Sequence, residues 1–346
     1  MDPALDPPLT RSWTVWHDRL HRELLQDPQL LPAGEPLLLA VSGGQDSMAL
    51  TALLLGLRRL HHWEIRLWHG DHGWHPGSAA IAAELQAWSL EQGLPITVDR
   101  NSSNNDATRQ TGGTEADGRH WRYTQLACCA AALGSRVVCG HTATDKAETL
   151  LLHLTRGTDL AGLGSLRRQR LLDAEQHPTV HLVRPLLGLS RDNTAAICEK
   201  LNLPIWLDPS NTNLRFSRNR IRQQVMPVLN DLYPGCEQRM AALSERLSQV
   251  QDTQQTLLAL SLEALKVGEG SKNLLQRKRF GALPLPLRRD LLAHWLQSCG
   301  APPLTAPLLE ELALASAAGS PAGGRDLPRG WRLHWDKKSL QLNYRQ

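Results

Sequence analysis

The sequence lacks the long apolar segments of a membrane protein and the leader of a secreted one. No run of about 18 apolar residues occurs in the 346-residue chain, so we expect no membrane span and no membrane partner. Residues 1–8 contain neither a basic segment nor an apolar core, which argues against a secretory signal. A hydrophobic content of 41% and a charged content of 21% indicate a soluble, cytoplasmic protein of two or three domains.

Paired cysteines are also absent, because none of the six cysteines belongs to a C-x-x-C motif. In a chain of this size, isolated cysteines predict reduced and mostly buried thiols. A zinc ribbon and a cluster-dependent enzyme are therefore disfavoured. The cysteines are Cys128, Cys129, Cys139, Cys198, Cys236 and Cys299.

Two common phosphate-binding motifs are missing, but the sequence predicts a different phosphate-binding arrangement of a strand, a glycine turn and a helix. No Gly-Lys-Ser/Thr follows the first apolar run, so there is no Walker A loop, and no G-x-G-x-x-G fingerprint occurs there. Instead, residues 37–41 predict a buried strand, Ser42-Gly43-Gly44 predicts a turn, and helical apolar spacing begins near Asp46. A strand, glycine turn and helix present free backbone N–H groups to an anion.

Asp46 stands at the mouth of this turn, where a carboxylate among phosphates requires a cation such as Mg²⁺. The candidate phosphate-binding residues are Ser42, Gly43, Gly44, Gln45, Asp46 and Ser47. On these six residues alone, an ordinary strand-to-helix turn with a capping side chain remains an equal alternative.

Further strands predicted at 65–69, 96–98, 136–141 and 181–184 alternate with helical segments near 78–92, 117–133 and 145–155. This alternation predicts an α/β fold with a doubly wound, mostly parallel sheet in residues 1–217. Sites in such folds lie at the carboxyl ends of the strands, so we expect His69, Gly140 and His141 to meet the glycine turn at one edge.

The composition changes to long helices around 215–225, which predicts a mainly helical domain over residues 218–346. Residues 331–344 alternate with period two around a polar turn and predict a terminal hairpin. Within 236–265, apolar residues recur at helical steps and predict a packing stripe made of Met240, Leu243, Leu247, Val250 and Leu257.

Several charged or polar segments each allow a bland and a functional interpretation. Asp145 and Glu148 share one side of a helix start, where they either complement the helix dipole or bind a cation. His69, Asp71 and His72 end a predicted strand, where they either bind a metal ion or position a nucleotide or a loop. Residues 101–115 predict a surface loop or an RNA-contacting lid. Basic clusters at 167–170, 215–222 and 277–279 make nucleic acid a plausible partner.

The segment Ser42–Ser47 resembles the Ser-Gly-Gly-x-Asp-Ser loop of the PP-loop ATP pyrophosphatases, and Gly140–Gly157 resembles the second signature of tRNA(Ile)-lysidine synthetases. The resemblance covers roughly residues 37–235. One departure is Thr144-Asp145-Lys146, where the family usually has Asp-Asp-Gln. The other segments similar to this family are Arg119, Arg122 and Tyr123, Arg184–Leu187, Arg191, Asp208–Asn211 and Arg218–Arg222.

The resemblance implies that ATP adenylates the C2 oxygen of the wobble cytidine in the CAU-anticodon isoleucine tRNA, after which L-lysine displaces AMP. The product, lysidine, changes codon reading from AUG to AUA. The implied catalytic residues are Asp46, Arg122, Asp145 and Glu148, with Asp46 holding Mg²⁺ and the pair Asp145 and Glu148 binding lysine. The implied ATP-binding set adds His69, Gly140 and His141 to the loop residues, and the implied tRNA-binding set is Arg218, Arg220 and Arg222.

Other functions remain open from the sequence. A thiolase-like PP-loop enzyme would require paired cysteines near the loop, and a GMP or NAD synthetase would lack the arginine segment at 218–222. A non-catalytic RNA-binding protein with an inactive nucleotide loop would have no need for Asp46 or for the acid pair. A homodimer is an open option.

Overall fold

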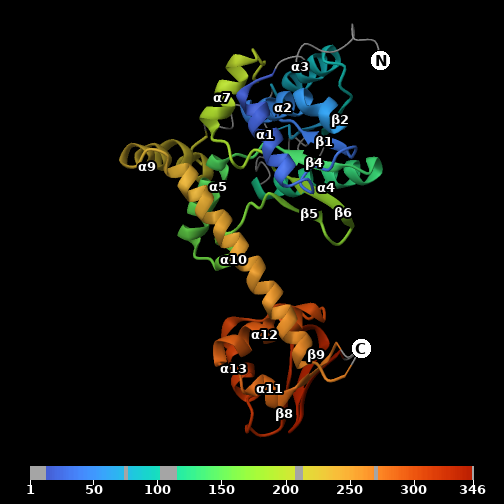
Figure 1. Cartoon of the computed structure of the whole chain (residues 1–346), viewed down its shortest axis with the longest axis vertical. Coiled ribbons are helices and arrows are strands. Elements are labelled where there is room, and N and C mark those ends of the chain that lie inside the picture. The colour runs from blue at the N-terminus through green and yellow to red at the C-terminus, as the bar shows by residue number, and fades with distance from the viewer. Residues whose placement is uncertain (1–12, 74–76, 102–114, 207–212, 269–271, 345–346) are drawn as a thin grey trace, which may run out of the picture. The chain divides into compact units, whose positions relative to one another are not determined.

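A six-stranded sheet lies at the centre of the N-terminal part of the chain (Figure 1). The computed structural model describes residues 13–73, 77–101, 115–206, 213–268 and 272–344. The strand order is β3-β2-β1-β4-β6-β5, and all are parallel except β5, which is antiparallel to β6. The predicted, mostly parallel sheet is confirmed. Its strands are β1 (Pro36–Ala40), β2 (Glu64–Asp71), β3 (Ile96–Arg100), β4 (Arg136–Cys139), β5 (Gln169–Asp173) and β6 (His177–Val183).

Helices cover both faces of this sheet, as a doubly wound fold requires. On β1, Leu37 and Leu39 pack into one core cluster and Leu38 into another, and all three are fully buried. A strand covered on both faces shows no alternation, which explains the continuous apolar run. The first cluster takes side chains from α1 (Val15–Gln26), α2 (Gln45–His61), α3 (Ser78–Glu91) and α7 (Arg191–Lys200), and the second from α4 (Glu115–Leu133).

A further group of helices follows the sheet in the chain and packs around α5 (Ala143–Arg156). Ala147 on α5 is buried against Met226 and Cys236. Residues well beyond the last strand of the sheet therefore form a core cluster with α5. The remaining elements of this part are α6 (Leu160–Leu163), α8 (Ser217–Arg220), the π-helical turn η5 (Ile221–Val225), α9 (Met226–Leu232) and the first turns of α10 (Cys236–Leu265).

The packing stripe predicted for residues 236–265 is wrong at three of its five positions, whereas Met240 packs against the core cluster around α5 and Leu247 is half-buried. Leu243, Val250 and Leu257 are 43%, 54% and 58% exposed. The buried side of the first turns of α10 is made of Ala241, Ser244 and Ser248 instead. Small residues let α10 approach its neighbours closely: the backbone of Ser248 lies against Gly164, and the Ser244 hydroxyl donates to the Leu163 carbonyl at 2.7 Å.

The C-terminal unit contains a four-stranded antiparallel sheet in the order β7-β10-β9-β8. The predicted hairpin is confirmed as β9 and β10, with Trp335 opposite Leu340, and the Asp336 carboxylate accepts the backbone N–H groups of the turn. Its elements are β7 (Leu274–Gln276), α11 (Arg277–Gly281), α12 (Leu285–Ser298), α13 (Ala306–Ala315), β8 (Gly323–Asp326), the 3₁₀ turn η6 (Pro328–Gly330), β9 (Trp331–Trp335) and β10 (Ser339–Tyr344).

The chain divides into the compact units 1–248 and 249–346, later than the predicted boundary between 217 and 218. The physical reason is that residues 218–248 are bonded to the N-terminal unit. Arg218 and Arg222 form ion pairs with α5, and Ser244 is hydrogen-bonded to the segment after α6. A change in composition marked the start of the helices, but side-chain contacts decide which unit they join.

Candidate active site

The turn between β1 and α2 is held open by a glycine and closed by its own serine hydroxyls. Gly43 has φ of +80°, and a Cβ there would lie 3.2 Å from the Trp206 ring. A side chain at this position is therefore disfavoured both by the backbone conformation and by the close contact with Trp206. The Ser47 hydroxyl donates to the Gly44 carbonyl at 2.8 Å and accepts the Ser42 N–H at 3.2 Å. The donors left for a phosphate are therefore the first backbone N–H groups of α2.

Asp46 lies in the first turn of α2 with few compensating charges. Its Oδ1 accepts the Thr194 hydroxyl at 2.5 Å, and its Oδ2 lies 3.5 Å from Arg191 Nη1. Burial raises the pKa of Asp46, and the Arg191 charge and the Thr194 hydrogen bond only partly offset this. A half-buried carboxylate with an incompletely balanced charge, beside a phosphate loop, fits a site for Mg²⁺, which uses one or two carboxylates together with substrate phosphates.

Two predicted residues from neighbouring strands meet this segment, as expected from the parallel pairing of β1 with β2 and β4. His69 Nδ1 donates to the Val41 carbonyl at 2.8 Å, and burial lowers the pKa of this buried imidazole. A Cβ at Gly140 would lie 2.7 Å from the Asp46 carbonyl oxygen. Only glycine therefore allows the end of β4 to approach the first turn of α2 so closely.

His141 and Arg122 each have an unusual environment, because the imidazole is buried and neutral and the guanidinium has a nitrogen without a partner among the described residues. Burial lowers the pKa of His141 to about 3, so the imidazole is neutral at pH 7, and its Nδ1 accepts the Nε–H of Arg184 at 3.2 Å. The Arg122 Nε is buried and has no hydrogen-bond partner among the described residues. A buried guanidinium N–H without a protein acceptor is suited to an anionic ligand.

The acid pair on α5 is already in contact with two of the predicted tRNA-binding arginines. Glu148 is fully buried, and its oxygens accept Arg222 Nε at 2.6 Å, Arg222 Nη2 at 2.9 Å and Arg218 Nε at 3.0 Å. Asp145 Oδ1 lies 3.2 Å from Arg222 Nη2. The Arg220 side chain is exposed and bonds only to Gln224 at 3.4 Å in the described residues, away from these acids.

Asp145 remains ionised although it is largely enclosed. Burial raises the pKa of Asp145, but the interactions with His141 and Arg218, the Thr142 N–H and the Arg222 charge outweigh burial and hold the pKa below its usual value. The Thr142 N–H donates to Asp145 Oδ2 at 2.8 Å as half of a capping box. The Asp145 side chain is 13% exposed whereas that of Glu148 is 0% exposed, so Asp145 is the more accessible acid.

Sequence reasoning missed the contribution of α7. Thr194 bonds Asp46, and the Gln45 side chain donates to the Arg191 carbonyl at 2.6 Å, so it ties α2 to α7. Thr194 belongs to no recognisable motif, and only the packing of α7 on α2 reveals its position. Among the resemblance segments, Asp208–Asn211 lie outside the described residues, as does the predicted loop at 101–115 for the most part.

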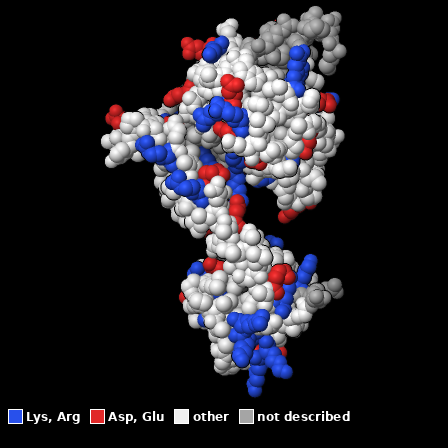
Figure 2. Space-filling model, in the orientation of Figure 1, with Lys and Arg blue, Asp and Glu red and all other residues white. Residues whose placement is uncertain are grey.

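One arginine of the basic cluster at 277–279 has a structural role. Arg277 is 3% exposed and donates to backbone carbonyls, including that of Asp336 at 2.6 Å and that of Ser320 at 2.7 Å. Lys278 and Arg279 of the same cluster are exposed. On the face seen in Figure 2, Lys and Arg side chains gather at the end of the C-terminal unit where β8 and α11 lie.

Metal-cluster chemistry finds no support in the part of the chain that the structure describes. Within that part, no group of three or more His, Cys, Asp or Glu side chains is placed to hold a metal ion. The interpretation of His69, Asp71 and His72 as a metal site is thus not supported. All six cysteines are free thiols, and three of them are buried. No helix among the described residues is long and apolar enough to cross a membrane.

The comparisons with known proteins point to one family for this chain. Residues 18–229 match the model of the PP-loop domain, and residues 275–340 match that of the TilS substrate binding domain. A tRNA(Ile)-lysidine synthase of Parasynechococcus marenigrum is 55% identical over 335 residues, covering 97% of this chain and 96% of the relative. A tRNA(Ile)-lysidine synthase of Prochlorococcus marinus is 41% identical over 340 residues, covering 96% of this chain and 97% of the relative.

Among solved structures, the U34-tRNA thiolase NcsA from Methanococcus maripaludis, solved with its [4Fe-4S] cluster, matches with a TM-score of 0.56. The sequence identity is 17%, over 68% of this chain and 79% of the thiolase, so this likeness concerns the fold alone. The full-length relatives are far more similar, and both family models fall on the two units in the expected order. The chain belongs to the tRNA(Ile)-lysidine synthase family.

Proposed function

We propose that the chain ligates free L-lysine to C2 of the wobble cytidine in the CAU-anticodon isoleucine tRNA, at the expense of ATP. In the first half-reaction, the C2 oxygen of cytidine attacks the α phosphate and pyrophosphate leaves. In the second, the ε-amine of lysine attacks C2, the bond from C2 to the adenylated oxygen breaks, and AMP leaves. The observation that supports this most strongly is the meeting of the phosphate loop and the acid pair at one sheet edge, in a chain of this family.

The first half-reaction needs anion binding more than proton transfer. The backbone N–H groups at the start of α2 would hold phosphate oxygens, and Asp46 would hold Mg²⁺, which neutralises phosphate charge when bound. Arg122 would stabilise negative charge near the α phosphate, and its buried Nε, which lacks a protein acceptor among the described residues, supports this role. His141 is neutral and is itself fixed by Arg184, which makes it suited to positioning rather than to carrying charge.

The second half-reaction needs a bound lysine whose amine loses a proton before attack. Asp145 is ionised and partly exposed, so it is the better first contact for an ammonium group. Glu148 is fully buried and holds Arg218 and Arg222, which keeps a cationic surface beside the acid for the tRNA or the adenylate. In this arrangement the lysine ammonium would share Asp145 with Arg222.

A transfer assay tests the function directly. Radiolabelled lysine should be incorporated into CAU-anticodon isoleucine tRNA only when ATP is present, and not into a tRNA whose wobble base is not cytidine. The Asp46→Ala variant should reduce tRNA-dependent exchange between ATP and pyrophosphate by at least about 100-fold, because Mg²⁺ and charge stabilisation are lost together. Wild-type exchange in this variant would refute the role of Asp46, and absence of lysine transfer by the wild-type protein would refute the function.

A further inference from the structure

Thr144 and Lys146 flank Asp145 on α5, in the segment where the resembled signature usually has Asp-Asp-Gln. Both are almost completely buried, with exposures of 4% and 2%. A buried ammonium group is very unfavourable unless an opposite charge and hydrogen bonds compensate it. The partners of these side chains therefore matter for the stability and the exact position of the first turn of α5.

Both partners are acids on α10. The Lys146 ammonium forms an ion pair with the Glu245 carboxylate, and the Thr144 hydroxyl donates to the Glu237 carboxylate. Thr144 Oγ1 also accepts the backbone N–H of Arg191 at 3.2 Å, which connects the same turn to α7. The residues on either side of Asp145 are thus each bonded to α10.

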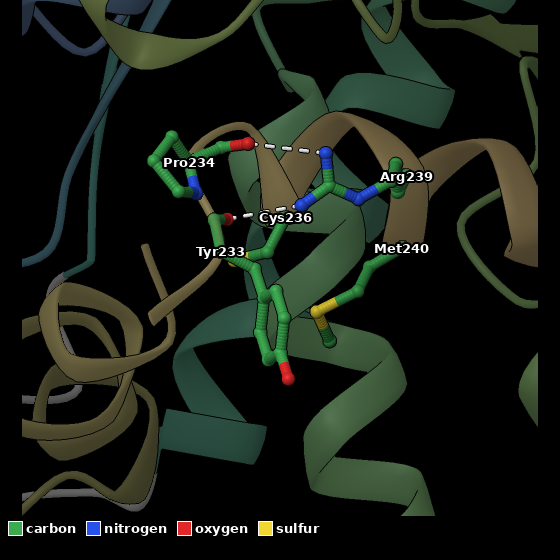
Figure 3. A pocket seen from close by; sticks show the side chains of 5 residues that line it. All are labelled: Tyr233, Pro234, Cys236, Arg239 and Met240. Carbon is green, nitrogen blue, oxygen red and sulfur yellow. Dashed lines mark hydrogen bonds between the residues drawn. The ribbon is translucent and has the colours of Figure 1, made fainter. Parts of the chain in front are cut away.

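Hydrogen bonds to the preceding turn and to α9 hold the start of α10, and with it the Glu237 carboxylate, in position. Arg239 donates to the carbonyls of Tyr233 and Pro234, each at 3.0 Å, and closes the turn that precedes the helix (Figure 3). Asn230 on α9 donates to the second Glu237 oxygen at 2.7 Å and accepts the Cys236 thiol at 3.1 Å. The cavity of about 470 Å³ seen in Figure 3 opens beside this turn and contains none of the predicted site residues.

We propose that Glu237 and Glu245 are positioning residues of the lysine site, which act through Thr144 and Lys146 to orient Asp145. The inference rests on the proposed role of Asp145 in lysine binding. Contacts within α5, such as the capping box with Thr142, set the rotamer of Asp145 but leave the position of the whole helix start to its neighbours. The contacts of Glu237 and Glu245 with Thr144 and Lys146 set the position of this helix start relative to α10. Displacements of about 1 Å are known to cost large factors in rate or binding at such sites.

The first test uses the full-length variants Glu245→Gln, Lys146→Gln and the double variant that combines them. We expect Glu245→Gln to raise the KM for lysine about tenfold, while the KM for ATP changes less than about twofold. The double variant should recover most of the loss, because two amides can bond to each other without a buried uncompensated charge. The matched control is Glu263→Gln, which removes an exposed acid near the end of α10 that pairs with Lys266 just beyond the helix, and should change neither constant.

A second pair of variants addresses Thr144. Thr144→Val keeps the shape of the side chain but removes the hydroxyl, and should also raise the KM for lysine, whereas Thr144→Ser should retain the wild-type value. Thermal unfolding of every variant is measured in parallel, and kinetics are compared at a temperature at which all are folded. A role limited to stability would lower the melting temperature without separating the two KM values, and this outcome would overturn the proposal.

Asp145→Asn distinguishes failure of this proposal from failure of the proposed lysine site. If Asp145→Asn leaves the KM for lysine unchanged, the lysine site itself is misplaced. If Asp145→Asn raises that KM but Glu245→Gln and Thr144→Val do not, the site stands and only the positioning role is refuted.

Discussion

Asp46 and Asp145 are two carboxylates at the same sheet edge, yet different interactions control their pKa values. For Asp46 burial prevails, and the pKa is raised. For Asp145 burial acts in the same direction, but His141, two arginines and a backbone N–H outweigh it, and the pKa is lowered. The protein thus compensates the charge of Asp46 incompletely, which matches a metal-binding role, whereas the arginines and the backbone N–H around Asp145 stabilise its ionised form.

This contrast predicts opposite effects of neutral replacements on stability. A raised native pKa means that Asp46 is penalised above that pKa, so Asp46→Asn should not decrease the free energy of unfolding at pH 7, and any gain should vanish at lower pH. A lowered native pKa means that ionised Asp145 stabilises the fold above its unfolded pKa. Asp145→Asn should therefore be destabilising at pH 7, with a difference that shrinks below about pH 4. Urea unfolding at several pH values measures both, and a larger loss for Asp46→Asn at pH 7 would contradict the assignment.

At the scale of elements, the contact between the end of β4 and the start of α2 places the acid pair beside the phosphate loop. This contact depends on Gly140, where an added Cβ would lie 2.7 Å from a backbone oxygen that has no freedom to move. Gly44, the N-cap of α2, differs from Gly140 because a side chain could be accommodated there. A Cβ there would meet only the Ser42 hydroxyl at 3.4 Å, and the backbone does not have a positive φ.

Alanine substitutions at Gly140 and Gly44 should consequently have different effects on the free energy of unfolding and on ATP binding. We expect Gly140→Ala to lower the free energy of unfolding by about 1–3 kcal/mol, since overpacking against the backbone forces a shift. Gly44→Ala should change stability by less than about 1 kcal/mol but weaken ATP binding, because the added Cβ would stand at the N-cap, beside the N–H groups proposed to bind a phosphate. Denaturant titration and equilibrium ATP binding measure these effects, and equal stability losses would count against the packing argument.

At the scale of the whole molecule, the chain combines two units with separate cores. The C-terminal unit contains the buried arginines Arg277 and Arg288 as well as an apolar core. Arg277 joins the segments around Ser316, Ser320 and Asp336 through their carbonyls, so a single guanidinium connects the end of α13, the following loop and the hairpin turn.

Replacement of Arg277 should therefore damage the C-terminal unit far more than replacement of its neighbour. Arg277→Gln should cost about 2–3 kcal/mol, because several buried carbonyls lose their donor. Lys278→Gln, at an exposed position of the same cluster, should cost less than about 0.5 kcal/mol but reduce the salt dependence of tRNA binding if it contacts phosphate. Calorimetry and tRNA binding at several salt concentrations measure both, and equal stability effects would refute the structural role of Arg277.

Much of the fold was predictable because its signals are local. The apolar run at Leu37–Leu39, the glycine turn and the helical spacing after Asp46 each occupy a few neighbouring residues, and parallel strands necessarily bring their carboxyl ends together. The antiparallel edge strand β5 and the stripe on α10 were not predictable in the same way. Whether Leu243 is buried depends on which surface α10 meets, and Gly164 with Ser248 shows that small residues make that contact.

The sequence by itself determined the strand, the phosphate loop, the acids on α5 and the family to which the chain is similar. Only the tertiary structure decided how these charges are paired. Glu148 contacts Arg218 and Arg222 from about 70 residues away, and Glu237 and Glu245 reach Thr144 and Lys146 from α10. Coulomb energies depend on distance and burial rather than on position along the chain, so partners this remote become visible only when the chain is folded.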